Sequence, residues 1–570
     1  MRPPSPTRTR IVWILAGALA AFAVVAAPSP ARADDQSVSV NFAATAAAPT
    51  YRASGWIYGM TENGTNPPSN FFTDVKFRAM RAGGAQLSGG GWQGGGYDRR
   101  WNATRAQMLR TKALGGTFIL LPHDLWGADG ANIPRYPGDN GNWTDYNNFL
   151  TRVIADVKAT GVPVQWDIWN EPNISIFWNR PQSQYFELWR RTYQRLRADL
   201  PGTLIVGPSY AGVPTTNNGA WWNQYLDYVK ANNVVPDIFS WHSLPGDPVA
   251  NVAAANTTLG ARGIAHPRPY QINEYGASDE QNPGDGAWYI TRLERAGADG
   301  LRANSASGGN LHNDLGNLLT HNSAGQYQPK GEWWVYNFYA GQTGSTVSTT
   351  ASAGYDAYAT KAAGNAKVLV GGGRTTGTIA VNLQGLETTS GVVIDNRARV
   401  VVQRIPYNNG GAVTGPVTVQ DGLVSLNGNA ARVTIANNTI TDAYTITVLP
   451  PSQSTPAPTP SATPSSPPAT GAACGASYQV VSSWQGGFQA DVAVSNTGSA
   501  TSRGWTVSWA LPSGQTVSQV WNGSLTTSGG TATVTNAGYN GSLAPGAGTS
   551  FGMIVSGSAA ETPTLTCSAT

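Results

Sequence analysis

The stretch "PVQWDIWNEPN", residues 163–173, joins a short run of apolar and aromatic side chains to a glutamate. The first seven residues of this run, 163–169, predict a buried strand. Glu171 lies just beyond it, between Asn170 and Pro172. A glutamate beside proline commonly opens a helix, because the helix dipole favours anions at that end. Whether Glu171 does more than that depends on the strands around it.

Strand candidates recur on both sides of this stretch, and helix-like sequence separates most of them. The others are residues 55–60, 85–89, 117–122, 204–208, 237–242, 269–273 and 300–304. Amphipathic runs at 146–161 and 183–202 end in Gly or Pro-Gly, as helices often do. Eight strands over roughly 290 residues predict a (β/α)8 TIM barrel within residues 34–340. An open doubly wound sheet is the alternative, but no Gly-rich phosphate loop follows any of these strands.

The composition changes twice after the barrel. In residues 341–449, Thr, Val and Gly become frequent and helix signals vanish, which predicts an all-β sandwich. The segment "SVSVNFAA" near the N-terminus could add a strand to it. Residues 450–472 are dominated by Pro, Ser and Thr and carry no charge, so they predict an extended linker. Residues 473–570 show short alternating strands and Gly turns, which predict a small second β-sandwich.

The N-terminal sequence predicts export. Three arginines precede an apolar run at residues 11–27, and Ala-Arg-Ala at 31–33 gives a small-x-small cleavage site. This pattern indicates a signal peptide over residues 1–33 and a secreted, extracellular protein. A membrane anchor is the alternative, but the run is short and no second hydrophobic stretch follows it.

Composition limits the partners. Only 12% of the residues are charged and the net charge is +4, while there are 20 Trp and 22 Tyr. No Lys/Arg cluster marks a nucleic-acid-binding face, so that class of partner is set aside. A neutral, aromatic-rich surface suits ring stacking better than steering by charge.

The chain has two cysteines, Cys474 and Cys567, near the two ends of the last segment. In an exported protein the simplest reading of such a pair is a disulfide. Closing so long a loop stabilises a domain by roughly 4–5 kcal/mol in the chain-entropy model. A metal site is the weaker alternative, because two thiols without nearby histidines make a poor ligand set.

Two glutamates follow strands of the predicted barrel. Glu171 comes after the fourth strand, and Glu274, in "QINEYG", comes after the seventh. The carboxyl ends of barrel strands face one rim, so the two side chains should converge there. Glycoside hydrolysis needs such a pair, one as an acid and one at the anomeric carbon. A separation of about 5–5.5 Å gives retention of configuration, and a wider gap gives inversion.

The Asn-Glu-Pro motif at 170–172, with Glu274 after strand seven, resembles glycoside hydrolase clan A. The barrel with a trailing β-sandwich is most similar to family 39, which contains β-xylosidases, iduronidases and arabinofuranosidase-type exo-enzymes. The resemblance covers roughly residues 40–449. It implies that Glu171 is the general acid/base and that Glu274 is the nucleophile.

The resemblance also implies roles for neighbouring residues. Asn170 would hydrogen-bond the sugar 2-hydroxyl, a contact that strengthens in the transition state. His242, ending strand six, would lie beside the nucleophile and help to keep it ionised; a core histidine is the alternative. Strand eight departs from many clan members, because "GLRANSASGG" offers Asn304 and small residues where an aromatic sugar platform is common.

Two further residues are candidates for substrate binding. His123, in "LLPHDLW" after strand three, suits a sugar contact and a structural hydrogen bond equally well. Trp92 lies in the glycine-rich loop "SGGGWQGGGY". Packing is the default role for such a tryptophan, but a loop aromatic at the rim could also clamp a sugar.

Residues 473–570 resemble a family 2 carbohydrate-binding module. The loops "SSWQGGF", "SQVWNGS" and "NAGYNGS" match the three that carry its exposed aromatics, which are Trp484, Trp521 and Tyr539 here. Flat rings on one face would stack on successive glucose units. In that family, a glycine at the position of Gly487 accompanies binding to cellulose. Trp505 alternates as a core strand residue.

The resemblances together imply a secreted retaining glycoside hydrolase that acts on plant cell-wall polysaccharide and is anchored to a cellulose surface. Exo action on xylose- or arabinose-containing chains, such as hemicellulose or arabinogalactan, is expected. No metal or organic cofactor is implied, and no membrane contact after signal cleavage. The alternatives are an endo-acting glucanase or xylanase on the same barrel, and a non-catalytic sugar-binding protein. The presence of both glutamates argues against the latter.

Overall fold

The computed structural model describes residues 36–130, 133–304, 311–372, 374–451, 473–484, 486–538, 540–544, 547–558 and 563–570. The predicted signal peptide and nearly all of the predicted linker lie outside the described residues. The chain divides into two compact units, Met1–Gln453 and Ser454–Thr570.

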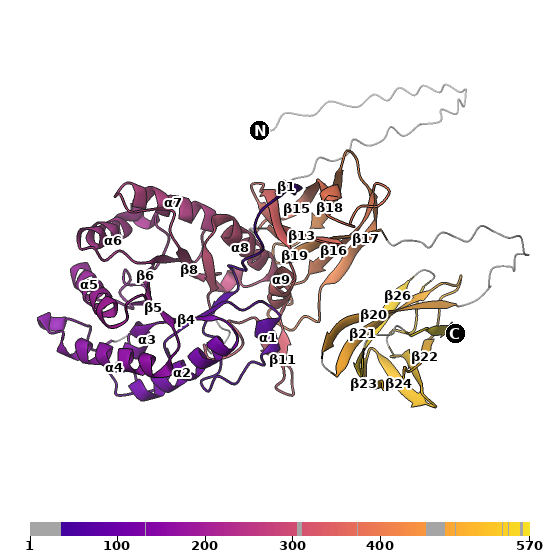
Figure 1. Ribbon diagram of the computed structural model, residues 1–570, viewed down its shortest axis with the longest axis horizontal. Coiled ribbons are helices and arrows are strands. Elements are labelled where there is room, and N and C mark those ends of the chain that lie inside the picture. Colours follow the sequence, from indigo (N-terminus) through magenta and orange to yellow (C-terminus); the bar gives the residue numbers. More distant parts are fainter. Residues whose placement is uncertain are drawn as a thin grey trace, which may run out of the picture. The chain divides into compact units, whose positions relative to one another are not determined.

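Eight strands close into a barrel in chain order, and helices surround it (Figure 1). The strands are β2 (Gly55–Ile57), β3 (Ala79–Ala82), β4 (Thr117–Leu120), β5 (Val164–Asp167), β6 (Leu204–Tyr210), β7 (Ile238–Ser243), β8 (Tyr270–Tyr275) and β9 (Asp299–Arg302). The helices are α1 (Asn70–Thr73), α2 (Tyr97–Ala113), α3 (Pro122–Trp126), α4 (Thr144–Thr160), α5 (Gln182–Asp199), α6 (Ala220–Ala231), α7 (Pro248–Gly260), α8 (Pro283–Ala296) and α9 (Gly331–Ala340). All neighbouring barrel strands are parallel, so the predicted TIM barrel is confirmed.

Helix α4 shows how the sequence builds the outer ring. Its buried side chains are spaced three or four residues apart and form one apolar stripe. They are Tyr146, Phe149, Leu150, Val153, Ile154 and Val157. The helix ends at Gly161, whose φ of +65° is left-handed and therefore favours glycine. No helix in the described part of the chain is both long and apolar enough to cross a membrane.

The predicted second strand, residues 85–89, is wrong. The second strand of the barrel is β3, and residues 85–89 follow it as turns, with Gln86 at a φ of +61°. β3 has Arg81 between Met80 and Ala82, so its sequence lacks the continuous apolar run that marks strands such as β4. The remaining barrel strands begin within one residue of the predicted positions.

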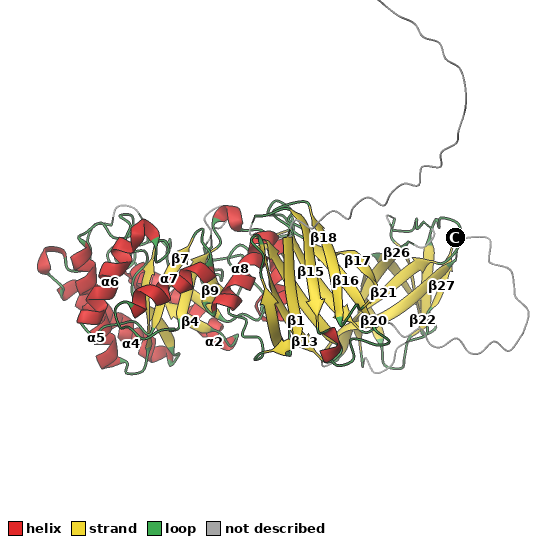
Figure 2. Cartoon of the chain, turned by 90° about the horizontal axis from the view of Figure 1, so that it is seen from above, coloured by secondary structure: helices red, strands yellow, loops and turns green. Residues whose placement is uncertain are grey.

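A nine-stranded sheet lies beside α8, and all of its strands except β1 follow the barrel in sequence (Figure 2). Its order is β17 (Val417–Ser425), β16 (Arg397–Ile405), β19 (Ala443–Leu449), β14 (Asn365–Gly372), β13 (Tyr355–Ala362), β12 (Ser345–Thr350), β1 (Gln36–Thr45), β15 (Gly377–Gln384) and β18 (Ala430–Asn437). The N-terminal segment containing "SVSVNFAA" supplies β1, with Val38, Val40 and Phe42 buried in the core of the sheet. A small hairpin, β10 (Leu319–His321) and β11 (Tyr327–Pro329), precedes α9.

The second unit consists of two four-stranded sheets around one core. One sheet contains β20 (Cys474–Trp484), β21 (Gly487–Asn496), β26 (Gly548–Ser556) and β23 (Thr516–Trp521), and the other contains β24 (Gly523–Ser528), β25 (Thr531–Asn536), β22 (Trp505–Ala510) and β27 (Thr566–Ala569). The predicted disulfide Cys474–Cys567 joins the first sheet to the second. Trp505 is only 2% exposed and stacks on Phe551, which confirms its predicted place in the core.

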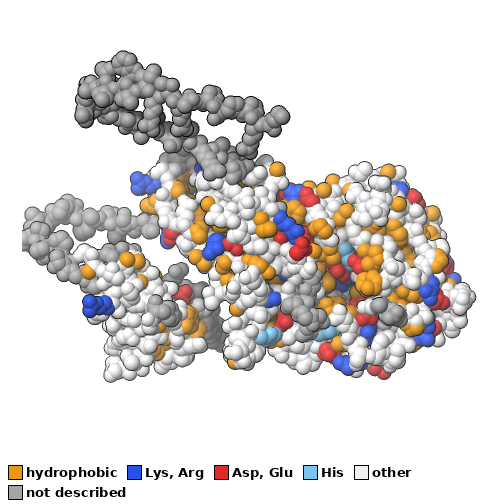
Figure 3. Space-filling model, turned by 180° about the vertical axis from the view of Figure 1, so that it is seen from behind, with side chains coloured by type: hydrophobic (Ala, Val, Ile, Leu, Met, Phe, Trp, Pro, Cys, Tyr) orange, Lys and Arg blue, Asp and Glu red, His pale blue; other side chains and the backbone are white. Residues whose placement is uncertain are grey.

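The surface carries few charges. On the face shown in Figure 3, acidic and basic side chains lie in small, scattered groups among uncharged ones. This agrees with the charged fraction of 12% and offers no broad basic face on this side of the molecule.

Candidate active site

Glu171 lies four residues beyond the end of β5, at the carboxyl end of the barrel. Its backbone has a φ of +43°, a left-handed conformation that is strained for a glutamate. Its amide donates a hydrogen bond to the carbonyl oxygen of Ser209, at 2.9 Å, on β6. Strained backbone of this kind concentrates at functional sites, where surrounding structure holds it in place.

Glu274 is the fifth residue of β8, and an irregularity in the sheet directs its side chain. The pairing of β7 with β8 runs from Trp241 opposite Ile272 to His242 opposite Glu274, and so skips Asn273. An extra residue in a strand re-aims the side chains around it. As a result, the consecutive residues Asn273 and Glu274 both hydrogen-bond to groups inside the barrel.

His242, the fifth residue of β7, lies between the two carboxylates. Its Nδ1 is 2.7 Å from Oε1 of Glu171, and its Nε2 is 3.7 Å from Oε1 of Glu274. The histidine is 1% exposed, whereas the side chains of Glu171 and Glu274 are 14% and 17% exposed. The structure therefore brings all three predicted residues together, with the hydrogen bond of His242 going to Glu171 and not to Glu274.

The ionisation of these three groups is linked. Burial opposes the charge of His242, but the Glu274 and Glu171 carboxylates raise its pKa above 6.5. Burial also opposes the charge of Glu171, but His242 and Arg81 lower its pKa below 4.5. The pKa of Glu274 is raised, because burial outweighs the opposing charges of His242 and Arg81. The proton between His242 and Glu171 thus belongs to the pair, and the ring nitrogen favours holding it.

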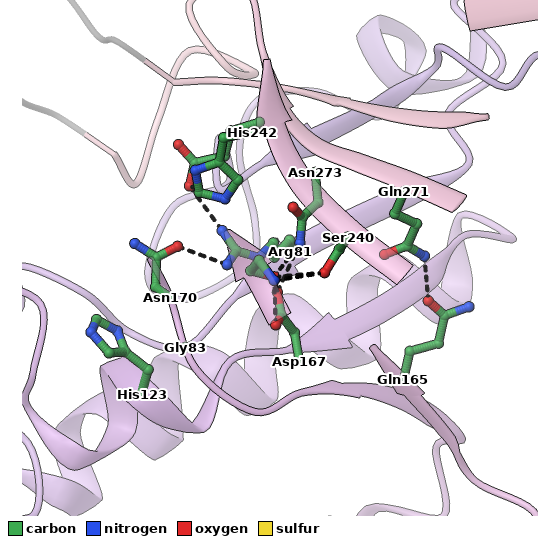
Figure 4. Close-up of polar contacts among 12 residues, drawn as sticks. Arg81, Gly83, His123, Gln165, Asp167, Asn170, Ser240, His242, Gln271 and Asn273 are labelled. Carbon is green, nitrogen blue, oxygen red and sulfur yellow. Dashed lines mark hydrogen bonds and ion pairs between the residues drawn. The ribbon is translucent and has the colours of Figure 1, made fainter. Parts of the chain in front are cut away.

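Arg81, on β3, was missed by the sequence interpretation and occupies the centre of the site (Figure 4). It is 2% exposed, and its guanidinium donates to three carboxylate or amide oxygens. Nε donates to Asp167 at 2.6 Å, Nη1 to Glu274 at 2.9 Å and Nη2 to Asn170 at 2.8 Å. The feature that could have identified Arg81 is an arginine within the small, apolar segment "AMRA". It was overlooked because the second strand was predicted at residues 85–89 instead.

Asp167 ends β5 and is completely buried. Its carboxylate accepts hydrogen bonds from Arg81, from Oγ of Ser209 at 2.7 Å and from Nδ2 of Asn273 at 2.9 Å. Ser240 completes the group, because its Oγ lies 3.0 Å from that of Ser209 (Figure 4). The upper lumen of this barrel is therefore a polar network and not the apolar filling usual for the fold.

Asn170, predicted to contact the sugar, is 8% exposed. Its Oδ1 accepts the hydrogen bond from Arg81. Its Nδ2 has no acceptor among the residues that the structure describes. The arginine thus fixes which way the amide faces and leaves the N–H donors free to meet a ligand.

His123 lies in α3 and is completely buried. Its Nδ1 is 2.7 Å from Oδ1 of Asp124, and its ring meets Trp169 and Phe177 edge-on, with centroids 4.8 and 5.4 Å apart. Its Nε2 is buried without a hydrogen-bond partner in the described part of the chain. In this state the ring supports the aromatic residues around Glu171 and has no surface on which a sugar could lie.

Trp92 does not join the two glutamates. Its ring packs edge-on against Tyr97 and Phe149, and its Nε1 donates to Asp145 at 2.9 Å. It therefore joins helices α2 and α4 in this structure. Of the predicted eighth-strand loop, Asn304 is buried and donates to the carbonyl of Leu311, while residues 305–310 lie outside the described part.

A cavity of about 680 Å³ lies elsewhere on the barrel. Residues 161–165 and 200–204, which lead into β5 and β6, form much of its wall. It is therefore at the amino ends of the strands, opposite the two glutamates. Because catalytic groups of TIM barrels gather at the carboxyl ends, this cavity is not the candidate active site.

In the second unit, one of the three predicted cellulose-binding aromatics can be described. Trp521 is half-buried, and its indole lies directly against Gly552 of the neighbouring strand, where any side chain would collide with the ring. Gly487 is buried and pairs with Trp484 across a hairpin. The side chain of Trp484 and the whole of Tyr539 lie outside the described residues.

The first unit has the fold of known proteins of the same size. N2152 from Neocallimastix frontalis aligns with a TM-score of 0.60 and 24% identity, over 73% of this chain and 100% of that one. A glucosidase from Croceicoccus marinus aligns with a TM-score of 0.51 and 13% identity, over 73% of this chain and 99% of that one. At these identities the likeness establishes the fold alone.

Curated relatives match a short part of the chain. Endoglucanase A of Thermobispora bispora is 52% identical over 94 residues, which are 16% of this chain and 21% of that protein. Chitinase 63 of Streptomyces plicatus is 44% identical over 82 residues, which are 14% of this chain and 13% of that protein. The chain thus covers 21% and 13% of the length of these two relatives.

A family model identifies the C-terminal segment. Residues 474–570 match the family described as cellulose binding domain. The match agrees with the two-sheet fold, the disulfide and the indole of Trp521 lying against Gly552. Residues 474–570 of this chain are a family 2 carbohydrate-binding module.

Proposed function

We propose that the protein is a secreted retaining glycoside hydrolase that degrades cell-wall polysaccharide while its C-terminal module holds it to cellulose. The observation that carries the proposal is the pair of glutamates at the carboxyl end of the barrel. Glu171 lies 2.7 Å from one ring nitrogen of His242, and Glu274 lies 3.7 Å from the other. Two carboxyl groups that face one space are the minimum that glycoside hydrolysis requires. Similarity to clan A, and to family 39 within it, supports the same assignment.

In the first step, Glu274 attacks the anomeric carbon and forms a glycosyl ester, while the bond to the leaving oxygen breaks. The leaving oxygen takes a proton from Glu171. In the second step, Glu171 removes a proton from a water molecule, which attacks the anomeric carbon and releases Glu274. Arg81 stabilises the carboxylate of Glu274 before attack and after release, because its Nη1 donates directly to it.

His242 supplies the proton that Glu171 needs. The pair shares one proton across a hydrogen bond of 2.7 Å, and either atom can carry it. When a leaving oxygen approaches Glu171, the proton is already within the pair and need not come from solvent. His242 therefore acts mainly on the acid, whereas the sequence interpretation placed its effect on the nucleophile.

A xylose- or arabinose-containing chain is the proposed substrate, cleaved from its end. Similarity to exo-acting enzymes of family 39 supports this substrate. The C-terminal module, which would bind the plant cell wall, supports it too. Endo action on a glucan or xylan is the alternative within the same barrel. The predicted signal peptide places the reaction outside the cell.

The test is hydrolysis of aryl xyloside, arabinofuranoside, galactoside and glucoside, and of arabinogalactan, arabinoxylan and cellulose. Turnover of at least one substrate is expected, with none by Glu274→Ala. NMR of the first product formed should show the same anomeric configuration as the substrate. Absence of turnover on every substrate would refute the enzyme, and an inverted product would refute the double displacement. Short oligosaccharides released early from a polymer would establish endo action.

The pKa directions of the two glutamates favour a second assignment, in which Glu171 is the nucleophile and Glu274 is the acid. Glu171 has the lowered pKa and Glu274 the raised one. Azide distinguishes the two. It should restore activity to Glu171→Ala with a product of retained configuration, and to Glu274→Ala with a product of inverted configuration. The opposite pattern would establish the second assignment.

A further inference from the structure

Asp167 is buried beneath both glutamates and takes no part in the reaction proposed above. It is completely buried, so no substrate atom reaches it. Yet its carboxylate is heavily hydrogen-bonded, with donors from Arg81, Ser209 and Asn273. A buried carboxylate is stable only when its charge is paired and its oxygens accept hydrogen bonds, and here both conditions are met.

Two of these donors belong to irregularities of the barrel. The pairing of β6 with β7 skips Ser209, and the pairing of β7 with β8 skips Asn273. Each is therefore the extra residue of a bulge, and Ser209 has a left-handed φ of +52°. Bulges bend a strand and re-aim the side chains around them. Asp167 holds both extra residues with one carboxylate.

Each bulge leads to one glutamate. The carbonyl oxygen of Ser209 accepts the amide hydrogen of Glu171 at 2.9 Å. Asn273 directly precedes Glu274 in β8. A change in the position of either bulge would therefore move a carboxylate that the reaction needs.

We propose that Asp167 is a positioning residue that sets both the separation and the ionisation of Glu171 and Glu274, through the two bulges and Arg81. The proposal rests on the function proposed above. One buried charge at the end of β5 thus holds groups that come from β3, β6 and β8.

The electrostatic part of the proposal has a definite sign. Glu274 faces Arg81 from β3, His242 from β7 and Glu171 from beyond β5. The negative charge of Asp167 partly balances Arg81. Without it, the arginine would attract Glu274 more strongly and favour its ionised form. The pKa of Glu274 would fall, and the acid limb of the activity profile would move to lower pH.

The test is Asp167→Asn, which keeps the shape of the side chain and removes its charge. We expect kcat on the best aryl glycoside to fall roughly 100-fold, because a misplacement of about 1 Å in a reacting group can cost that much. We also expect the acid limb of kcat/KM against pH to move to lower pH. The matched control is Asp356→Asn, a buried aspartate paired with Arg292 and Arg295 away from the site. It should leave the pH profile unmoved.

A folded Asp167→Asn protein with the wild-type kcat would overturn the proposal. A lower kcat with an unmoved acid limb would reduce Asp167 to a structural role. If Asp167→Asn does not fold, a second variant is Asn273→Ala. It keeps the charge of Asp167 and removes the hydrogen bond through which Asp167 holds the bulge in β8. It should lower kcat, and a wild-type kcat in that variant would contradict the positioning role.

One readout does not depend on activity. The chain has five histidines, so the ring of His242 can be followed by NMR and assigned with His242→Gln. Asp167→Asn should lower the pKa of His242, because Arg81 then opposes its charge more strongly. An unchanged titration overturns the inference even if no substrate is found. If the wild type hydrolyses nothing, the proposed function fails separately.

Discussion

Two buried arginines of the barrel bind their carboxylates in different ways. Arg302, on β9, forms parallel hydrogen bonds to Glu332, from Nε to Oε1 at 2.7 Å and from Nη2 to Oε2 at 2.5 Å. Glu332 is 5% exposed, so the pair is closed to solvent. Arg81 instead divides its donors among three acceptors, and the side chain of one of them, Glu274, remains 17% exposed.

The difference distinguishes a structural ion pair from a reactive one. A bidentate pair gives each carboxylate oxygen of Glu332 a strong donor and holds one geometry. A divided guanidinium leaves Glu274 with one strong donor and an accessible oxygen. The same two residue types therefore produce a fixed contact between β9 and α9 in one place and an available carboxylate in the other.

The largest expected effect separates the two carboxylates. Glu274→Gln keeps an acceptor for Arg81 and should lower kcat roughly 10⁴- to 10⁶-fold, as the loss of a nucleophile does, with little change in stability. Glu332→Gln leaves Arg302 without a counter-charge and should lower the free energy of unfolding by about 3–5 kcal/mol, with the folded fraction still active. Aryl-glycoside kinetics and thermal unfolding measure both. More than a tenth of wild-type activity in Glu274→Gln would break the comparison.

The next effect separates the two arginines. Lysine cannot reproduce a planar fork with several donors. Arg81→Lys cannot reach three acceptors at once and should lower kcat roughly 100-fold. Arg302→Lys should lower the melting temperature and leave kcat of the folded protein close to that of the wild type. Equal losses of kcat in the two variants would show that the division of the Arg81 donors among three acceptors has no effect on catalysis.

The pH profile sharpens the contrast further. The pKa of Glu274 is raised, so under the proposed roles the acid limb of kcat/KM should lie above pH 4.5. The pKa of His242 is also raised, so its pair with Glu171 should keep its proton to above pH 6.5. His242→Gln removes the proton store and should move the alkaline limb to lower pH. An alkaline limb that does not move would assign the proton to Glu171 alone.

The smallest expected effect concerns the C-terminal module, which contains neither ion pair. Trp521→Ala removes a ring that lies against Gly552 and should weaken binding of the whole protein to insoluble cellulose. A stacking contact of this kind contributes roughly 0.5–1.5 kcal/mol beyond its buried area, so the loss should be several-fold. Sedimentation with cellulose measures it. Hydrolysis of soluble aryl glycosides should stay unchanged, and a parallel loss there would contradict the separation of the two roles.

Most of the barrel could be predicted, because its strands are apolar runs bounded by glycine and proline. Residues 117–122 and 204–208 are examples, and both hold strands in the structure. The second strand was not predicted, because its sequence "AMRA" combines a buried arginine with no β-branched or aromatic side chain. A short strand with a functional charge lacks the hydrophobic signal by which strands are recognised.

The candidate active site was also predicted only in part. Glu171 and Glu274 were evident from their places after strands, and the structure joins them through one histidine. Which of the two glutamates would hydrogen-bond His242 was not evident. The ring nitrogens of His242 lie 2.7 Å from Glu171 and 3.7 Å from Glu274, and the bulges set this difference. Nothing in the local sequence marks Ser209 or Asn273 as an extra residue.

The sequence by itself determined the order of the elements, the chemical types at the rim, the disulfide and the module that binds cellulose. Each of these depends on residues close together in the chain or on a short motif. Only the tertiary structure decided that Arg81 and Asp167 lie beneath the two glutamates. That arrangement requires strands from four parts of the chain to close into a barrel, where buried charges must find partners wherever they lie in sequence.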